Sequence, residues 1–593
     1  MAKASKNIQV LSEHEHILKR PTIYVGSVKT SDENVPIIKD KKIYNVIKPI
    51  SVGMYKLFDE VFSNSVDEAK RMSSKMKEIV VSVDSRKNSM SVEDSGDGFY
   101  NGSSINQKSG LTNVATAVSM LRAGSNFEND SIEESLIGTN GMGVSLVNAL
   151  SSDFTIRTIN KKEVYFQQWN DFIAGEPVVK DRPKNLKTGT LVSFTPLKSV
   201  FDGCLWDIDI VRSTLIFKKR VLESEEKTKD IKIILVWDGK NEEIKSDLYF
   251  EESYKTPIGE ILIWETYENS FSPSFVNSAI CTGVHQKIIY DEINSYLDDS
   301  LGHHFYDFLL ILNLPPGLVK FGDQNKTKFV TKRDEIDNIV STNFSSKLKG
   351  FTKTKLFSRI LKKVEDRKRS SELKTIRRER KKINVKYSHK YFPPTMSKAK
   401  NLFIVEGLSA MGSILQKRNT KTDGVYALKG KIKNARTLGD LSSNREILEL
   451  MQILNLDPES PSAEMPYDNI VIATDQDPDG AHITSLLINL FYSWFPWIVK
   501  RKKLYFLETP LVSTGDRSKN YYYSLEAFKK SGTSSKTNVR YLKGLGSLSL
   551  EDWDFVMKNK RLINITEDKS SPKLLDMAFG KSSDARKAWL SGF

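Results

Sequence analysis

The sequence predicts an α/β protein that is divided into several domains. Its length of 593 residues is too great for one hydrophobic core, so about three or four domains are expected. In both halves, strand-like apolar segments run into loops of glycine or aspartate, and helical patterns follow these loops. A strongly basic segment at 353–390 separates the halves and is the clearest linker.

The composition, with 39% hydrophobic and 27% charged residues, is that of an ordinary globular protein. Cys204 and Cys281 lie far apart, which indicates neither a disulfide framework nor a zinc site. No N-terminal apolar segment resembles a signal peptide. The longest apolar run, 483–499, contains Thr, Ser, Asn and Pro, so a buried helix is a better interpretation than a membrane span. We therefore expect a cytoplasmic protein with no membrane partner.

The first half contains a helical pattern with two polar residues on one face. The segment LFDEVFSNSVDEA (57–69) has apolar residues at helical spacing. Glu60 and Asn64 are four positions apart and therefore share one face of that helix. A carboxylate and a carboxamide placed there could polarise a water molecule and hold a metal ion. An exposed polar stripe is the alternative.

Two strand patterns follow, and the second ends in a glycine-rich loop. EIVVSVDS (78–85) alternates like a strand, and SMSVEDSGDGF (89–99) is a strand that ends at Asp94, Gly96 and Gly98. Glycine lets the backbone approach a flat ring closely, and Asp94 could accept a hydrogen bond from an exocyclic amine. A plain hairpin turn is the competing interpretation.

A second glycine loop lies in IGTNGMGVSLVNAL (137–150). Gly138, Gly141 and Gly143 precede an apolar helix, an arrangement that presents backbone N–H groups and a helix N-terminus to phosphate. The spacing differs from the Rossmann fingerprint, and no strand leads directly into the loop. The order of the three features, more than any one of them, favours a nucleotide site.

The linker combines strong positive charge with helical spacing. Between Lys353 and Lys390 there are 16 lysines and arginines against 4 acidic residues. Leu356, Ile360 and Val364 recur every four positions, which predicts an amphipathic helix with a basic face. The helix is either a solvated linker or an electrostatic footprint for a nucleic-acid backbone.

Acidic residues follow two apolar strands in the second half. KNLFIVEGLSAMGSI is an apolar strand that ends at Glu406, and NIVIATDQDPDG is a second one, followed by Asp475, Asp477 and Asp479. The carboxyl ends of parallel strands are where α/β sheets place their sites, and carboxylates gathered there could hold Mg²⁺. An acidic turn closed by Gly480 is the alternative.

The features of the first half closely resemble the ATP site of the GHKL family, which includes type II topoisomerases and histidine kinases. The resemblance implies ATP as a cofactor, Glu60 as the general base for the hydrolytic water, and Asn64 as a ligand of ATP-bound Mg²⁺. It also implies Asp94 on the adenine amine, assisted by Thr190 of KTGTLVSF. The other implied nucleotide contacts are Gly96, Gly98, Ser125 and Asn126 of AGSNF, Gly138, Thr139, Asn140, Gly141, Met142, Gly143, Val144 and Ser145.

Two further segments resemble type II topoisomerases in particular. LSEHEHILKRPTIYVGS (11–27) is similar to their N-terminal arm, and FGDQNKTKF (321–329) is similar to their transducer loop, which reaches the γ-phosphate from a second domain. The resemblance implies Gln324, Asn325 and Lys326 at the nucleotide. Lys326 is given a catalytic role, because a lysine on a mobile domain would report whether ATP is intact.

The acidic residues of the second half resemble the Toprim pattern, a glutamate plus D-x-D. This implies catalytic Glu406 with Asp475 and Asp477 as Mg²⁺ ligands, and Asp479 supporting a second ion. ALKGKIKNARTL, RYLKGLGSLS and FGKSSDARKAWLSGF resemble type IIA topoisomerases, which implies DNA contacts by Lys429, Lys431 and Lys543. Two departures from the family pattern are Leu408, where an Asp is usual, and Ala427, where a Pro is usual.

The predicted fold is therefore α/β (α+β multidomain), with a GHKL (Bergerat) ATPase sandwich, a ribosomal-protein-S5-like transducer, a basic helical linker and a Rossmann-like Toprim domain. The expected divisions are an arm (1–30), the ATPase domain (31–205), the transducer (206–350), the linker (351–398), the Toprim domain (399–515) and the C-terminal part of the Toprim region (516–593).

The resemblance implies the ATPase and Toprim subunit of a type II DNA topoisomerase. ATP would join two ATPase domains into a homodimer, and one double-stranded DNA would pass through a break in another. The chain stops at Phe593, and none of its 21 tyrosines matches the family's winged-helix domain, so a separate subunit is expected to carry that domain and the catalytic tyrosine. Bacterial gyrase and topoisomerase IV are divided at the same place, but the segments 11–27 and 321–329 look more eukaryote-like than bacterial. This combination most resembles the large subunits of T-even phage topoisomerases, which implies the cytoplasm of a bacterial host.

Two other functions remain open. A repair or clamp ATPase of MutL type, without transesterification, would need no acidic triad in the second half. A nuclease with a Toprim domain would cleave DNA without a partner.

Overall fold

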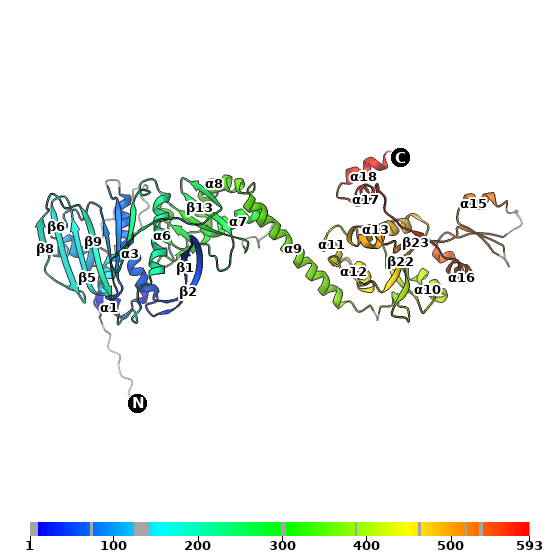
Figure 1. Ribbon diagram of the computed structural model, residues 1–593, viewed down its shortest axis with the longest axis horizontal. Coiled ribbons are helices and arrows are strands. Elements are labelled where there is room, and N and C mark those ends of the chain that lie inside the picture. Colours follow the sequence, from blue (N-terminus) through cyan, green and yellow to red (C-terminus); the bar gives the residue numbers. More distant parts are fainter. Residues whose placement is uncertain are drawn as a thin grey trace, which may run out of the picture. The chain divides into compact units, whose positions relative to one another are not determined.

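The computed structural model in Figure 1 divides into two compact units, Met1–Val364 and Glu365–Phe593, and each unit is described separately. The structure describes residues 10–71, 75–123, 141–297, 304–323, 325–385, 388–460, 464–515, 519–532 and 538–591. Within these ranges, no helix combines the length and the apolar character needed to cross a membrane.

A nine-stranded sheet forms one part of the first unit, with the order β11-β10-β3-β4-β9-β5-β6-β7 and with β8 beside β6. Neighbouring strands are antiparallel, except that β10 and β3 are parallel. Because β10 and β11 follow residue 205, the sheet continues past the predicted end of the ATPase domain. The strands are β3 (Glu78–Asp84), β4 (Ser89–Asp94), β5 (Ser151–Ile159), β6 (Glu163–Asn170), β7 (Ile173–Ala174), β8 (Val178–Asp181), β9 (Gly189–Pro196), β10 (Lys232–Trp237) and β11 (Lys240–Ile244).

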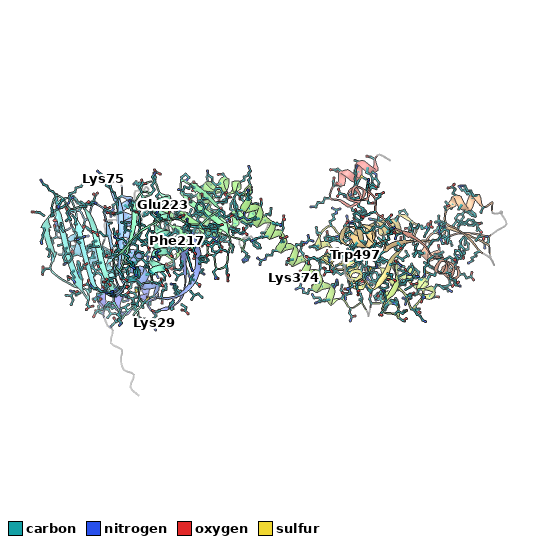
Figure 2. The ribbon with its side chains drawn as sticks, viewed as in Figure 1. Lys29, Lys75, Phe217, Glu223, Lys374 and Trp497 are labelled. Atoms are coloured by element: carbon teal, nitrogen blue, oxygen red, sulfur yellow. The ribbon has the colours of Figure 1, made fainter. Side chains whose placement is uncertain are left out.

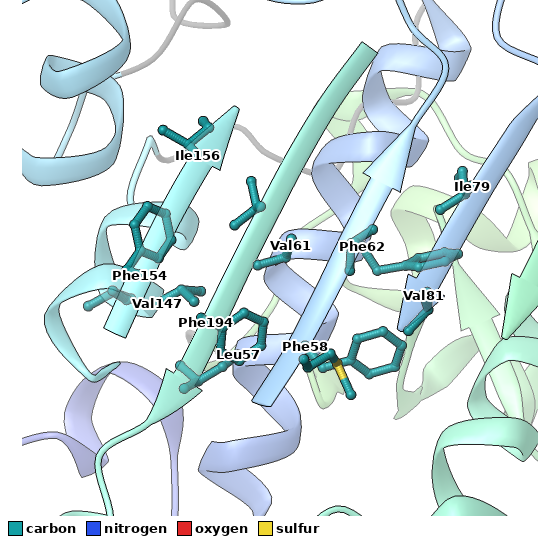
Figure 3. Packing of buried hydrophobic residues seen from close by; sticks show 14 of the residues in the cluster. Leu57, Phe58, Val61, Phe62, Ile79, Val81, Val147, Phe154, Ile156 and Phe194 are labelled. Atoms are coloured by element: carbon teal, nitrogen blue, oxygen red, sulfur yellow. The ribbon is translucent and has the colours of Figure 1, made fainter. Parts of the chain in front are cut away.

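Helix α3 (Val52–Lys70) packs on this sheet and confirms the helix predicted over 57–69. Ser51 caps it by accepting a hydrogen bond from the backbone N–H of Met54. Its buried side chains contribute about 1.5–3 kcal/mol each through removal of apolar surface from water. Figure 3 shows this packing between Leu57, Phe58, Val61 and Phe62 of the helix and Ile79, Val81, Phe154, Ile156 and Phe194 of the strands.

The remaining helices of this part of the unit are α4 (Asn113–Ser119), α5 (Gly143–Ala149) and α6 (Ile208–Ser224). A five-stranded sheet, β12-β13-β17-β14-β15, forms a second part of the unit. The remaining elements of the unit are α1 (Glu13–Lys19), α2 (Thr22–Val25), β1 (Ser31–Lys39), β2 (Lys42–Ile50), β12 (Glu252–Thr256), β13 (Gly259–Glu265), β14 (Ser274–Val276), β15 (Ala279–Ile280), β16 (Thr282–Gly283), α7 (Val284–Leu297), β17 (Tyr306–Leu312), β18 (Lys328–Phe329) and α8 (Arg333–Phe351).

The predicted amphipathic helix of the linker is confirmed as α9 (Lys355–Lys382), which spans the division between the two units. Its first apolar residues, Leu356, Ile360 and Val364, are buried in the core of the first unit. Leu373 and Ile376 are buried in the core of the second unit. Lys374, which is labelled in Figure 2, belongs to the exposed face of the helix.

The second unit contains a six-stranded sheet, β19-β21-β20-β22-β23-β27, whose four central strands are parallel. A smaller sheet has the order β25-β24-β26. The strands are β19 (Tyr391–Phe392), β20 (Ala399–Glu406), β21 (Asp423–Leu428), β22 (Tyr467–Ala473), β23 (Leu504–Glu508), β24 (Val512–Thr514), β25 (Asn520–Tyr522), β26 (Val539–Tyr541) and β27 (Arg561–Asn564).

The apolar run 483–499 forms two helices where the sequence predicted one. Pro496 lacks an N–H group, and the first helix ends just before it, at Trp494. The helices of the second unit are α10 (Gly407–Lys417), α11 (Leu438–Ser443), α12 (Arg445–Ile453), α13 (Pro478–Trp494), α14 (Pro496–Lys500), α15 (Leu525–Lys530), α16 (Leu550–Lys558), α17 (Ser571–Phe579) and α18 (Ser583–Leu590).

Candidate nucleotide and metal sites

Helix α3 places the predicted base, Glu60, against the glycine loop. A Cβ atom at Gly143 would lie only 2.2 Å from Glu60 Oε2, so only glycine allows this approach. On its other side, Glu60 Oε1 is 2.8 Å from the Nζ atom of Lys56, one helical turn earlier. The structure therefore brings together two features that are more than 80 residues apart in the sequence.

The charges around Glu60 keep its carboxyl group ionised. Burial alone would raise the pKa of Glu60, but the ammonium groups of Lys56 and Lys326 outweigh it and hold the pKa below its ordinary value. Lys326 belongs to the loop that precedes β18, and burial lowers its own pKa while Glu60 opposes that change. Lys326, which the sequence analysis predicted at the nucleotide, is thus near enough to Glu60 for its charge to lower the pKa of that carboxyl group.

Asp94, at the end of β4, is buried and accepts three hydrogen bonds. It accepts hydrogen bonds from Ser65 Oγ at 3.0 Å, from the N–H of Gly96 at 2.9 Å and from the N–H of Thr190 at 3.3 Å. Burial raises the pKa of Asp94 to about 6, with a further contribution from the charge of Glu68. A carboxyl group with this pKa can act as a hydrogen-bond acceptor at neutral pH.

Two glycines beside Asp94 have close neighbours at the positions where a Cβ atom would stand. Gly98 has φ +73°, and a Cβ atom there would lie 2.3 Å from the carbonyl oxygen of Ile159. A Cβ atom at Gly96 would lie 2.7 Å from Cγ of Glu68. The predicted D-x-G-x-G loop is therefore tightly packed at the end of β4, an interior strand of the sheet.

The other predicted nucleotide-binding residues lie in different surroundings, and some of them fall outside the described residues. Asn64 is exposed on α3. Asn325 lies against the arm, where its side-chain amide can donate to Val25 O at 3.1 Å and accept from the N–H of Gly26 at 3.2 Å. The described part of the glycine loop comprises Gly141, Met142, Gly143, Val144 and Ser145. Ser125, Asn126, Gly138, Thr139, Asn140 and Gln324 lie outside the described residues.

Three residues of this site were missed in the sequence. Lys56 lies four positions before Glu60, and Asp59 immediately precedes Glu60. Ser65 follows Asn64 and reaches Asp94 from α3. Helical spacing from Glu60 could have identified Lys56, whereas the contact of Ser65 with Asp94 depends on how α3 packs on the sheet.

The predicted acidic residues of the second half gather at the carboxyl ends of two neighbouring parallel strands. Glu406 is the last residue of β20, which pairs with β22, and Asp475 and Asp477 follow β22. Asp475 Oδ1 accepts from the N–H of Leu545 at 2.6 Å, and Asp477 Oδ1 accepts from the N–H of Gly480 at 2.7 Å. Leu545 belongs to the segment RYLKGLGSLS, whose sequence resembles type IIA topoisomerases. Its hydrogen bond to Asp475 brings this segment to the site.

The electrostatics of this cluster fit a cation. Burial, and then the charges of Asp475 and Asp477, raise the pKa of Glu406 above its ordinary value. Glu406 Oε2 is buried and accepts no hydrogen bond from any described residue. Among the described residues, no three His, Cys, Asp or Glu side chains stand close enough to form a ready-made metal group. The carboxylates of Asp475 and Asp477 are therefore near enough to influence Glu406, but the three do not form a complete set of metal ligands in this structure.

Exposed lysines flank the acidic cluster. Asp479 Oδ1 lies 2.7 Å from Nζ of Lys431, which lowers the pKa of Asp479. Lys429 and Lys543 are exposed on the same two segments whose sequences predicted DNA contacts. Leu408 is 52% exposed on the first turn of α10, whereas Ala427 is buried in β21. No contact in the structure explains either departure from the family pattern.

Comparison with known proteins relates this chain to type II DNA topoisomerases and to the Toprim domain family. Residues 401–509 match the Toprim domain family. The chain is 29% identical to DNA topoisomerase 2 of Meyerozyma guilliermondii over 685 aligned positions, covering 100% of this chain and 47% of the relative. It is 28% identical to a DNA topoisomerase 4 subunit of Enterococcus faecalis, covering 98% of this chain and 90% of that protein. The ATPase region of Saccharomyces cerevisiae topoisomerase II has the same fold over 61% of this chain and 100% of that one, with a TM-score of 0.50 and 24% identity.

The chain is therefore homologous to type II DNA topoisomerases and contains a Toprim domain. Both named relatives belong to the topoisomerase class of isomerases. The predicted α/β, multidomain fold class is confirmed, since 61% of the chain has the fold of a topoisomerase II ATPase region and residues 401–509 match the Toprim domain family. The chain spans about half the length of its fungal relative, 47%, and 90% of its bacterial relative.

Proposed function

We propose that this chain is the ATPase and Toprim-bearing subunit of a type II DNA topoisomerase, which uses ATP to pass one DNA duplex through a break in another. The observation that carries this proposal is the environment of Glu60. Two lysines from different parts of the first unit, Lys56 and Lys326, keep its carboxylate ionised beside the glycine loop. An ionised carboxylate in this position can accept a proton from a water molecule that attacks a phosphate.

The first unit supplies the residues for ATP binding and hydrolysis. Asp94 would accept the adenine amine, assisted by Thr190, which pairs with it across β4 and β9. Lys326 would contact the terminal phosphate, and Asn64 would hold the ATP-bound Mg²⁺. ATP binding would stabilise a homodimer through the ATPase domains, which captures a second duplex.

The second unit supplies a metal site for DNA cleavage. A magnesium ion there would stabilise charge at a DNA phosphate and at the leaving oxygen. Glu406, Asp475 and Asp477 would hold it, with Asp479 beside a second ion. The unpartnered oxygen and raised pKa of Glu406 support this role, because they mark a carboxylate for which the described residues provide no cation.

We assign the catalytic tyrosine to a separate polypeptide with a winged-helix domain. The similarity over 90% of a bacterial protein that is itself named as one subunit of topoisomerase 4 supports this division. Within the class, the large subunit of T-even phage topoisomerases is the proposed type, acting in the host bacterial cytoplasm. The domain divisions predicted from the sequence are retained as part of the proposal.

DNA would contact the exposed lysines beside the acidic cluster and the basic face of α9. Lys429, Lys431 and Lys543 are exposed, and Lys431 lies 2.7 Å from Asp479. On α9, the buried apolar residues leave the lysines and arginines on the exposed side. Neutralisation of phosphates by such groups is the main source of sequence-independent DNA affinity.

Reconstitution tests the proposal as a whole. The full chain is mixed with a tyrosine-bearing topoisomerase subunit, supercoiled plasmid, ATP and Mg²⁺, and relaxation and cleavage are followed on gels. We expect ATP-dependent relaxation only when both proteins are present. Asp475→Ala should retain ATP hydrolysis and assembly but lose cleavage, whereas Asp468→Ala, at the start of the same β22, should cleave normally.

Other results would favour the two rival functions. Cleavage of DNA by this chain alone would indicate a Toprim nuclease. ATP hydrolysis without relaxation or cleavage, with any tyrosine subunit that binds the chain, would favour a clamp ATPase. Normal cleavage by the Asp475→Ala enzyme would mean that the aspartates form an acidic turn and not a metal site.

A further inference from the structure

A row of charged groups continues from Glu60 through the first unit to a turn of the second sheet, in which the two lysines are buried and the two carboxylates are half-buried. Lys56 Nζ is 2.8 Å from Glu60 and 2.9 Å from Asp59, and Asp59 is 2.5 Å from Nζ of Lys218 on α6. Lys218 Nζ also donates to the backbone oxygen of Ser278 at 3.1 Å. The order of this relay is therefore Glu60, Lys56, Asp59, Lys218 and the Ser278 carbonyl.

The turn at the far end of the relay is held firmly. Asn277 and Ser278 connect β14 to β15, and both have positive φ, 46° and 69°. Such angles are uncommon for residues other than glycine, so surrounding contacts must fix them. Asn277 exchanges two hydrogen bonds with the backbone of Leu314, at 2.9 and 2.7 Å. Leu314 precedes the segment that leads to Lys326.

Helix α6 is packed against the strand that enters this turn. Phe217, which is labelled in Figure 2, lies 5.7 Å from Phe275 of β14 between ring centroids. Phe217 precedes Lys218, so a displacement of β14 would also displace the Lys218 side chain. The second sheet therefore reaches the base through helix α6 and Lys218.

We propose that Lys56, Asp59 and Lys218 are positioning residues for ATP hydrolysis, which fix the Glu60 carboxylate and link it to the turn at residues 277–278. This inference rests on the proposed ATPase function and extends it to a coupling path. Removing one member leaves a buried charge without its partner, which is strongly unfavourable. The state of the turn is thereby transmitted to the base.

Charged side chains on several neighbouring elements act on Glu60 and its partners in the relay. Helix α3 contributes Lys56, Asp59 and Asp67, α6 contributes Lys218, and the loop before β18 contributes Lys326. Helix α5 and the turn at 277–278 contribute only uncharged side chains. Within this group, Lys218 neutralises Asp59, and Asp59 opposes ionisation of Glu60.

The relay predicts opposite effects for its two removable charges. The acid limb of kcat against pH reports protonation of the base. Lys218→Met leaves Asp59 less neutralised, so the limb should move to higher pH by roughly one unit. Asp59→Asn removes the repulsion and should move the limb to lower pH. The double variant should return close to the wild-type limb, and KM for ATP should change little throughout.

The experiment measures ATP hydrolysis by the full chain from pH 3 to 8, because the pKa of Glu60 lies below its ordinary 4.5, and melting curves at each pH establish folding. Lys218→Arg retains the positive charge, so the acid limb of kcat should stay at its wild-type pH. Lys219→Met is the matched control, because Lys219 is the next residue of α6 and bonds to the carbonyls of Lys229 and Ile231 instead. We expect that control to follow the wild-type profile.

Failure of the relay can be distinguished from failure of the ATPase assignment. If Glu60→Gln hydrolyses ATP like the wild type, the proposed function itself is wrong. If Glu60→Gln is inactive but Lys218→Met and Asp59→Asn shift the limb in one direction, or not at all, the relay is wrong. If Lys218→Met does not fold, the other two variants decide. An Asp59→Asn limb at or above the wild-type pH, or a double-variant limb that stays as low as that of Asp59→Asn, contradicts the relay.

Discussion

Glu60 and Glu406 are placed in similar acidic surroundings but differ in how their charge is balanced. Both have neighbouring aspartates that oppose ionisation. At Glu60, Lys56 and Lys326 lower the pKa, whereas the charges acting on Glu406 come from aspartates and raise its pKa. Lys431 pairs with Asp479 at the edge of the second site and leaves Glu406 itself unbalanced.

This difference separates a proton acceptor from a metal ligand. A base must be ionised before its substrate arrives, so cations supplied by the protein suit Glu60. A carboxylate cluster that awaits Mg²⁺ is electrostatically unfavourable until the ion binds, and this suits Glu406. The two sites can therefore be tested by removing the charge, or the cation, that makes them different.

The largest effect is expected for Glu60→Gln. Loss of a general base typically lowers turnover by about 10²–10⁴-fold, while ATP binding should remain because the adenine contacts are untouched. Steady-state hydrolysis and equilibrium nucleotide binding measure the two effects. Glu93→Gln, which removes an exposed partner of Arg157 on the same sheet, is the control. An unchanged hydrolysis rate in Glu60→Gln would remove Glu60 from this role.

Lys326→Ala should have a smaller effect on hydrolysis. A charged hydrogen bond contributes about 1.5–3 kcal/mol, so turnover should fall by roughly 10–100-fold without unfolding of the first unit. Lys328→Ala changes an exposed lysine two residues later and should be nearly silent. Wild-type turnover of Lys326→Ala would show that the loop is not part of the ATP site.

Local sequence patterns predicted the separate elements of both sites better than the contacts between them. The spacing of Leu57, Val61 and Val66 predicted α3, and alternation predicted β3, because apolar periodicity follows directly from the geometry of helices and strands. The resemblance predicted Glu60, Asp94 and the acidic residues. These assignments depended on motif order, since no one motif decided between a site and a turn.

The missed features depend on tertiary packing. The approach of Gly143 to Glu60 and the relay through Lys218 join residues that no local pattern connects. The nine-stranded sheet also includes β10, which pairs in parallel with β3. This pairing was missed because β3 lies about 150 residues earlier in the chain. Lys56 is the exception, because its position four residues before Glu60 was visible in the sequence.

Asp94 provides a test that depends on pH. Its pKa of about 6, against an ordinary 3.8, means that the carboxylate acceptor is lost as the pH falls through 6. Adenine nucleotide affinity should therefore fall by at most about tenfold per pH unit below that value, as in any one-proton equilibrium. Because phosphates also titrate near this pH, Asp94→Asn is the reference. Calorimetric titrations with equal slopes for the two proteins would contradict the adenine role of Asp94.

The smallest effect, and the most direct test of the comparison, is expected for Glu406→Gln. In the metal-free fold, the pKa of Glu406 is raised above 4.5, so the folded state holds a proton that the unfolded state releases. The resulting loss of stability develops as the pH rises through 4.5 and is complete above the raised pKa. Replacing the carboxylate should therefore stabilise the chelator-treated protein at neutral pH, by about 2–4 °C in Tm for each kcal/mol, and have no effect in acid.

Magnesium should reverse the order of stability of the wild type and Glu406→Gln. Added Mg²⁺ should raise the Tm of the wild type but raise that of Glu406→Gln much less, because one ligand is lost. Glu508→Gln is the matched control, since Glu508 ends the neighbouring strand β23 but already has Arg561 at 3.1 Å. It should gain no stability in chelator and should keep the response to Mg²⁺. A destabilised Glu406→Gln in chelator would mean that the protein itself balances this carboxylate, as it does at Glu60, and the distinction between the two sites would no longer hold.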